Sequence, residues 1–232
     1  MNLTTSFEAA VPADVFARYQ FFETRNAAAI MRATNQEAFG EIIDILRYFV
    51  LIDDDLVLAG GEESGLAKRL NYEFRSRGWR EGRVDTAIKL VLRLMPFADA
   101  GETTVHVEES EVTNEGYKVD NVKDRIAMDL EWNAKDGNLD RDLAAYRALY
   151  DAGLIDGAIL VTRTIDDLRE LGYRIRIDSG MDEKTARKVL TTSTTTNTKK
   201  LLPRLQRGDA GGCPVLAVAI CERTWMGYER QD

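Results

Sequence analysis

VDNVKDRIAMDLEWN, residues 119–133, sets the architecture expected for this chain. Its second half alternates apolar and polar residues, as a β-strand does. Four apolar side chains share one face of this strand: Ile126, Met128, Leu130 and Trp132. Asp129 and Glu131 share the other face with Ala127, and their Cα atoms should lie roughly 6.5–7 Å apart. The stretch therefore predicts a central strand with an apolar back and an acidic front.

Two carboxylates this close repel each other, so the pKa of one should rise unless a cation neutralises them. Asp120 precedes the short turn at 121–125 and is placed to supply a third oxygen ligand. An acid, a hairpin-like turn and an acid-x-acid strand form the layout of a divalent-metal site used in phosphodiester hydrolysis. The alternative interpretation is a strand face whose carboxylates are simply solvated.

This pattern resembles the PD-(D/E)xK nuclease motif, in the form found in type II restriction endonucleases of the BglII/BstYI (BamHI-like) group. The matching positions are Asp120, Asp129 and Glu131, with VKDR at 122–125 between the first two. The broad superfamily usually has Lys at the third position, and BglII and BstYI have Gln there. Glu131 stands at that position here, which excludes a lysine general base but not catalysis, since BamHI also has Glu.

The resemblance implies an α/β fold with a restriction-endonuclease-like core, that is, a central mixed β-sheet flanked by helices. It implies a homodimer that cuts palindromic double-stranded DNA with Mg²⁺. Asp120, Asp129 and the main-chain carbonyl of Leu130 would hold the metal. Glu131 would position or deprotonate the attacking water, or bind a second metal. Glu81 falls where this group places an accessory active-site residue.

Two polar loops are candidates for DNA contact. Asn133 and Lys135 directly follow the acidic strand. The segment 191–200, TTSTTTNTKK, is rich in hydroxyl groups and supplies the other candidates: Ser193, Thr194, Thr195, Thr196, Asn197, Lys199 and Lys200. Hydroxyls and amides can bond base edges, while lysines neutralise phosphates. The same composition also suits a plain flexible linker.

Composition limits the class of protein. A chain of 232 residues suits one domain, here a helical N-terminal half at 1–100 packed on a catalytic core at 101–222. The net charge of −8 argues against indiscriminate nucleic-acid binding, though a basic cleft remains compatible with it. The sequence shows neither an apolar run of about 18 residues nor a signal peptide, so we expect a cytoplasmic protein. Cys213 and Cys221 lie in apolar surroundings and should be buried free thiols.

Periodicity predicts the remaining elements. Helices are expected within 7–32, over 35–52, 65–77 and 139–152, and around 165–171. Strands are expected at 105–112, 157–162, 173–177 and within the closing run 207–220, with 157–162 and 173–177 forming a parallel pair. Residues 86–96 suit either a strand or a helix. Gly60-Gly61 and Ser64-Gly65 predict a loop.

Basic residues are densest in and after the predicted helix 65–77: Lys68, Arg69, Arg75, Arg77, Arg80 and Arg83. They either contact phosphates or form a solvated face. His106, the single histidine, has no neighbours that would make it catalytic, which disfavours Ser-His-Asp hydrolases. The functions that remain open are a site-specific restriction endonuclease, a repair or nicking nuclease of the same fold, and a catalytically inactive DNA-binding protein.

Overall fold

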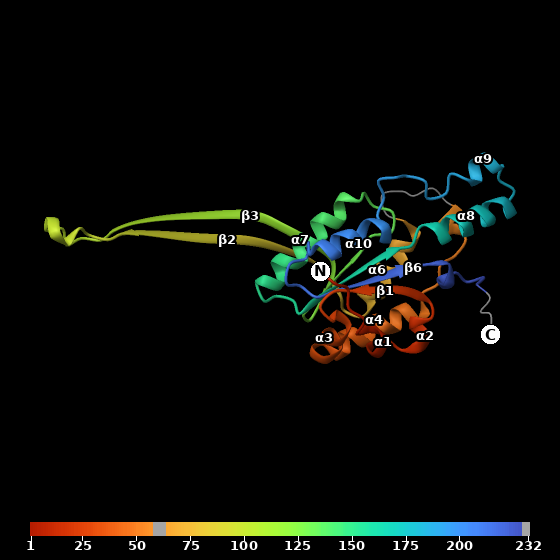
Figure 1. The fold of residues 1–232 in the computed structure, drawn as a ribbon, viewed down its shortest axis with the longest axis horizontal. Helices are drawn as coiled ribbons and strands as arrows, with labels where there is room; N and C mark the ends of the chain where they lie inside the picture. The colour runs from red at the N-terminus through yellow and green to blue at the C-terminus, as the bar shows by residue number, and fades with distance from the viewer. Residues whose placement is uncertain (58–63, 229–232) are drawn as a thin grey trace. The chain divides into compact units, whose positions relative to one another are not determined.

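The computed structural model describes residues 1–57 and 64–228, so the predicted loop glycines Gly60 and Gly61 lie outside it. The first elements are α1 (Phe7–Ala10), α2 (Ala13–Phe16), β1 (Tyr19–Glu23), α3 (Ala27–Thr34), α4 (Gln36–Tyr48), α5 (Asp54–Val57) and α6 (Gly65–Ser76). The central strands are β2 (Arg80–Leu94), β3 (His106–Lys123) and β4 (Ile126–Leu130). The last elements are α7 (Gly137–Asp151), β5 (Gly157–Arg163), α8 (Asp166–Asp178), α9 (Glu183–Ala186), α10 (Thr198–Arg207) and β6 (Val215–Ile220) (Figure 1).

The strands form a six-stranded mixed sheet in the order β1-β6-β5-β4-β3-β2. β4 and β6 each run parallel to β5, whereas β1 and β3 run antiparallel to their neighbours β6 and β4. Every residue of β5 and β6 is buried, because helices cover both faces of these strands. The predicted α/β fold, with a mixed sheet flanked by helices, is confirmed.

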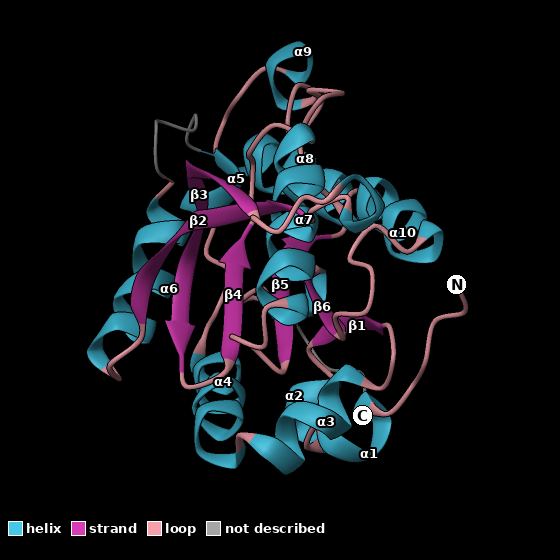
Figure 2. Ribbon diagram, turned by 90° about the vertical axis from the view of Figure 1, so that its left-hand side faces the viewer, coloured by secondary structure: helices cyan, strands magenta, loops and turns pink. Residues whose placement is uncertain are grey.

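The alternation predicted for residues 126–132 is also confirmed. Ile126, Met128, Leu130 and Trp132 all belong to the main apolar core. Met31 of α3 and Leu46 of α4 pack in the same core, on the side of the sheet where Figure 1 shows α1 to α4. The opposite face of β4 and β5 is covered by α7, visible in front of β5 in Figure 2. Asp129 and Glu131 therefore project toward α7.

The prediction of helices alone over 7–32 was wrong. Residues 19–23 form β1, in which Tyr19, Phe21 and Glu23 are buried and alternate with more exposed residues. β1 completes the sheet edge by pairing with β6. Burial of Glu23 is possible because its carboxylate accepts hydrogen bonds from the main-chain N–H of Ala28 (2.9 Å) and from the main chain of Ser6.

The predicted strand at 173–177 was also wrong, because these residues belong to α8. Leu168, Leu171 and Ile175 continue one buried helical face, and this longer period overrides the local alternation of YRIRI. Arg176 is fixed by a bond from its Nε to the carbonyl of Leu56 (2.9 Å). The parallel partners of β5 are instead β4 and β6.

The described residues form two compact units, Arg83–Lys118 and the rest of the chain. The smaller unit consists mainly of β2 and β3, so the undecided segment at 86–96 is a strand as far as Leu94. The N-terminal hundred residues are therefore not wholly helical. Within this unit, a Cβ at Gly116 would lie only 1.4 Å from the carbonyl oxygen of Val84, so β2 and β3 approach too closely there for any other residue.

Other expectations concern single residues. Cys213 and Cys221 are buried free thiols, as predicted. His106 is exposed at the start of β3. Within the part of the chain that the structure describes, none of the helices combines the length and apolarity required to span a membrane.

Candidate active site

The hairpin of β3 and β4 brings Asp120 and Asp129 together. Asn121 is paired with Met128 in the antiparallel register, so the next position places Asp120 opposite Asp129. The main-chain N–H of Asp120 donates to Asp129 Oδ1 (2.8 Å), and the N–H of Leu130 donates to Asp120 Oδ2 (3.2 Å). Directly opposed residues of antiparallel strands point to the same face. The two carboxylates thus form one pair at the end of the hairpin ladder.

Two further acids extend this pair. Glu131 follows on the same strand face and is 5% exposed, with Asn138 Nδ2 donating to its Oε1 (3.4 Å). Asp142 of α7 is 1% exposed, and Arg141 Nη2 donates to its Oδ1 (3.3 Å). The charge of Asp142 raises the pKa of both Asp129 and Glu131, which places it in the same cluster.

Asp142 was not identified from the sequence as a site residue, although its position in the helical pattern indicates a buried acid. Leu139, Leu143 and Tyr146 define the buried face of α7, and position 142 lies on that face at helical spacing. An acid on the buried face of an amphipathic helix is rare unless it has a partner or a ligand. The helix was predicted correctly, but its single buried acid was not singled out.

Three carboxylate oxygens of the cluster are buried without a hydrogen-bond donor: Asp129 Oδ2, Glu131 Oε2 and Asp142 Oδ2. The phenol of Tyr146 lies beside Asp129 and lowers the pKa of that carboxyl by hydrogen bonding, and the same hydroxyl lies 3.3 Å from the carbonyl oxygen of Ile159. Buried acceptors that lack a donor are costly. The arrangement is therefore one that a cation or a proton would stabilise.

The pKa values follow from this crowding. Burial raises the pKa of Asp129 to about 7, and the charges of Asp142 and Asp120 add to the effect. Burial and the charge of Asp142 raise the pKa of Glu131 to about 9. Burial also raises the pKa of Asp120 and of Asp142. The sequence predicted one raised pKa in the acid-x-acid pair, and in the structure both are raised.

The solvent side of the cluster is formed by Asp120 and Glu81. Asp120 is half-buried and Glu81 is exposed in β2. Burial is the main cause of the raised pKa of Asp120, the charge of Glu81 adds to it, and Arg141 and Arg75 oppose it. Both arginines are exposed. Two cations and an additional acid therefore surround the accessible edge of the acidic cluster.

The donor set suits a divalent cation such as Mg²⁺. Among the described residues, no group of three His, Cys, Asp or Glu side chains already has the spacing of a metal site. The carboxylates of Asp120, Asp129 and Glu131 nevertheless supply only oxygen ligands, which Mg²⁺ prefers. Two of these residues contribute a buried oxygen without a donor. Small side-chain movements toward a cation would relieve both the repulsion and the missing bonds.

The two predicted DNA-contact loops are joined in the structure. Lys135 forms an antiparallel bridge with Thr195. The N–H of Asp136 donates to the carbonyl of Thr194 (2.7 Å), and the N–H of Thr196 donates to the carbonyl of Ala134 (2.9 Å). The hydroxyl-rich segment is therefore fastened beside the acidic strand at this point.

The members of these loops differ in exposure. Asn133, Lys135, Ser193 and Thr194 are exposed, whereas Thr195, Thr196 and Asn197 are buried. Thr196 Oγ1 donates to the carbonyl of Glu131 (2.9 Å), and Asn197 Oδ1 accepts the N–H of Lys200 at the start of α10 (3.3 Å). Lys199 pairs with Asp166 (2.6 Å) and Lys200 with Asp136 (3.4 Å). The buried residues therefore hold the 191–200 segment in place, and the exposed residues are accessible to a ligand.

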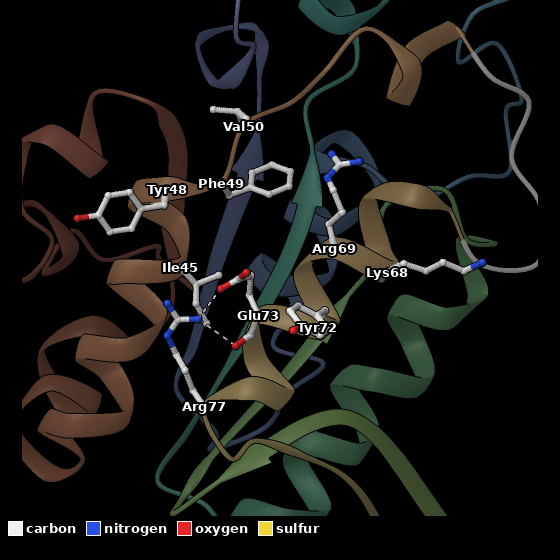
Figure 3. Close-up of a pocket in the computed structure, with 9 residues that line it drawn as sticks. All are labelled: Ile45, Tyr48, Phe49, Val50, Lys68, Arg69, Tyr72, Glu73 and Arg77. Carbon is white, nitrogen blue, oxygen red and sulfur yellow. Dashed lines mark hydrogen bonds and ion pairs between the residues drawn. The ribbon is translucent and has the colours of Figure 1, made fainter.

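A separate cavity of about 490 Å³ lies between α4 and α6 (Figure 3). It contains none of the predicted catalytic, metal-binding or loop residues, but three members of the predicted basic group line it: Lys68, Arg69 and Arg77. Its walls are mainly apolar, with Phe49 facing Arg69. Arg69 is paired with Asp55 (2.7 Å), and Arg77 with Glu73 (2.6 Å). Two of the three cations that line the cavity therefore already have carboxylate partners, and the one acid of the lining, Glu73, is one of those partners.

The chain was compared with protein-family models and with curated proteins. A family model described as restriction endonuclease BglII/BglIII matches residues 19–220. The match runs from the first residue of β1 to the last residue of β6, and it includes the whole acidic cluster and both loops. The comparison with curated proteins found no match.

Proposed function

The chain belongs to the BglII/BglIII restriction endonuclease family, and from this premise we propose how its residues recognise and cut DNA. Membership makes it a type II restriction endonuclease, an enzyme that cleaves double-stranded DNA at specific sites. The observation that carries the proposal is the opposed pair of Asp120 and Asp129, with Glu131 beside it and buried oxygens that lack donors.

We assign the metal ligands to Asp120, Asp129 and the main-chain carbonyl of Leu130, with Mg²⁺ as the cofactor. Mg²⁺ bound there would supply charge that acidifies water and offsets the negative charge of the transition state. Asp120 is the most accessible of these acids and would meet the substrate first. Its main-chain N–H holds one oxygen of Asp129, which fixes the direction of the other. Glu81, at the solvent edge, is the accessory acid of the proposal.

Glu131 would orient the attacking water and accept its proton. With a pKa of about 9 it is protonated at neutral pH, and a protonated carboxyl cannot act as a base. A positive charge beside it lowers that pKa, so its activity as a base depends on a filled metal site. Asp142 contacts the same carboxyl and would assist by holding its orientation.

Arg141 is expected to help bind the scissile phosphate, because a phosphodiester anion must approach a cluster of acids. Its side chain is 60% exposed, and its charge acts on Asp120. Replacing Arg141 with Ala should weaken DNA binding about 10-fold at low salt and reduce the slope of log K against log salt by about one. The measurement is a salt titration of binding to a fluorescent duplex.

Arg147→Ala is the matched control for that prediction. Arg147 lies on the same helix and is similarly exposed, but it pairs with Asp151 (3.7 Å) away from the acids. Its removal should leave the salt slope unchanged. If the slope of log K against log salt is the same for the Arg141 and Arg147 variants, Arg141 does not bind phosphate.

Recognition is assigned to the joined loops. The exposed residues Asn133, Lys135, Ser193 and Thr194 would contact bases and phosphates, while the buried members and Lys199 and Lys200 would shape the loop from behind. A two-fold homodimer would match a palindromic site, with each subunit cutting one strand. We retain one endonuclease domain over 1–232, and a cytoplasmic location, as proposals from the sequence.

Digestion of a phage genome with purified protein and Mg²⁺ tests the proposal. Discrete fragments whose ends share one palindromic sequence are expected, and EDTA should prevent their formation. Random nicks, or fragments that form in EDTA, would contradict it. Size-exclusion chromatography with light scattering checks the dimer, for which twice the chain mass of 26.1 kDa is expected.

A further inference from the structure

Arg163, the last residue of β5, is a buried cation that none of the assignments above uses. Its side chain is fully buried, and among the described residues it has no carboxylate partner within ion-pair distance. Burial lowers its pKa to about 10, so it remains charged at neutral pH. A buried charge without a counter-charge is costly and is seldom retained for stability alone.

The guanidinium instead organises the start of the recognition loop. Nε donates to the carbonyl of Trp132 (2.8 Å), and the group lies 5.9 Å from the centre of the Trp132 ring. Nη2 donates to Asn133 Oδ1 (3.3 Å) and to Thr195 Oγ1 (3.0 Å). One side chain therefore connects the end of the acidic strand with both loops proposed to contact DNA.

These contacts fix the orientation of the Asn133 amide. A guanidinium has only donors, so the amide atom that faces Arg163 must be the oxygen Oδ1. The amide nitrogen Nδ2 is then directed away from Arg163, and Asn133 is exposed to solvent. The loop consequently offers two N–H donors to a ligand, while the acceptor of the same side chain is already occupied.

We propose that Arg163 is a positioning residue that makes Asn133 a reader of guanine. In the major groove guanine presents two acceptors, O6 and N7, which match the two hydrogens of Nδ2. Asparagine that reads adenine uses its oxygen as well as its nitrogen, and that oxygen is engaged by Arg163. This inference rests on the proposed function, because it assumes that the Asn133 loop faces the DNA.

The first test changes the chemistry of position 133. Binding of wild-type protein to partly randomised duplexes in Ca²⁺, followed by sequencing, gives the base preference at each position without cleavage. Asn133→Asp retains an acceptor for Arg163 but offers no donor to DNA. We expect the preference for guanine to fall at least 10-fold at one position, and a base with an amino group, such as cytosine, to be favoured there. Replacement of that guanine by 7-deazaguanine should weaken wild-type binding.

The second test changes the positioning residue. Arg163→Met should relax the preference at the same base pair, because Asn133 can then rotate, while other positions stay unchanged. The control is Arg176→Met, since Arg176 also bonds a main-chain carbonyl, that of Leu56 (2.9 Å), but contacts neither loop. Thermal unfolding checks that both variants fold. If Arg163→Met does not fold, the Asn133→Asp result decides alone.

The outcomes separate the inference from the proposed function. A guanine preference that is unchanged in Asn133→Asp, or in folded Arg163→Met, overturns the inference even if the wild type cuts DNA at a defined site. If the wild-type protein instead requires a base amino group at the position that Asn133 reads, the inference is overturned as well. Wild-type protein that neither binds a defined sequence nor cuts DNA overturns both.

Discussion

An Asp129→Asn variant is expected to lose Mg²⁺-dependent DNA cleavage by about three orders of magnitude or more, while still binding DNA. Asp129 is 4% exposed and lies opposite Asp120, and one of its oxygens has no donor. The amide is nearly isosteric, but it replaces a charged oxygen ligand with a neutral group. Single-turnover cleavage of a labelled duplex measures the chemical step, and a gel-shift in Ca²⁺ measures binding.

The control for this loss is Asp124→Asn. Asp124 lies in the same hairpin and is exposed at a positive φ of 50°, a conformation that Asn also adopts readily. The same chemical change at this position should leave both cleavage and binding near wild-type values. A normal cleavage rate in Asp129→Asn would show that the acidic cluster is not the reaction site.

The sequence was sufficient where a short local pattern determines the structure. The alternation of residues 126–132 predicted a strand with an apolar back, and the core confirms that face. The hairpin between Asp120 and Asp129 is local as well, so a turn and an antiparallel register are enough to bring the two acids together. Short-range proximity of this kind can be deduced from spacing.

Long-range packing explains what the sequence did not reveal. Helical spacing marks Asp142 as a buried acid of α7, but it joins the cluster only because α7 lies over β4 and β5, which no local pattern specifies. The link from Arg163 to Asn133 and Thr195 spans three segments of the chain. At 173–177 the sequence predicted a strand where the structure has a helix. The alternation of YRIRI fits a strand, but its residues also fit a helical period, and only the packing of Ile175 with the rest of α8 decides between the two.

The burial of the acidic cluster also predicts how metal binding depends on pH. Carboxylates must be ionised to bind a metal, so the raised pKa values couple their ionisation to metal binding. Asp129 and Glu131, with pKa values of about 7 and 9, hold protons readily in the metal-free chain. Metal binding would release those protons, so apparent metal affinity should increase with pH.

The metal-free protein is expected to become less stable as pH rises from 5 to 8, by at least about 3 kcal/mol in the free energy of unfolding. The folded pKa of Asp129 is raised from 3.8 to about 7, so the folded state binds a proton that the unfolded state has already lost. Stability is therefore highest below the unfolded pKa and falls until pH passes the folded pKa. Glu131, whose pKa is raised from 4.5 to about 9, adds to the loss over the same pH range and extends it above pH 8, so the figure of about 3 kcal/mol is the part that Asp129 contributes.

Thermal unfolding in EDTA at pH 5.5 and pH 8 measures this effect. A change of about 3 kcal/mol corresponds to a Tm lower by roughly 6–12 °C at the higher pH. Asp129→Asn removes the titrating group, so its Tm should depend less on pH and exceed that of the wild type at pH 8, whereas Asp124→Asn should follow the wild type. Mg²⁺ should raise the wild-type Tm more at pH 8 than at pH 5.5, because it binds the ionised acids. A metal-free chain that gains stability over this range would show that the carboxylates are ionised without a cation, and the cluster would then lack the repulsion on which the proposed metal site depends.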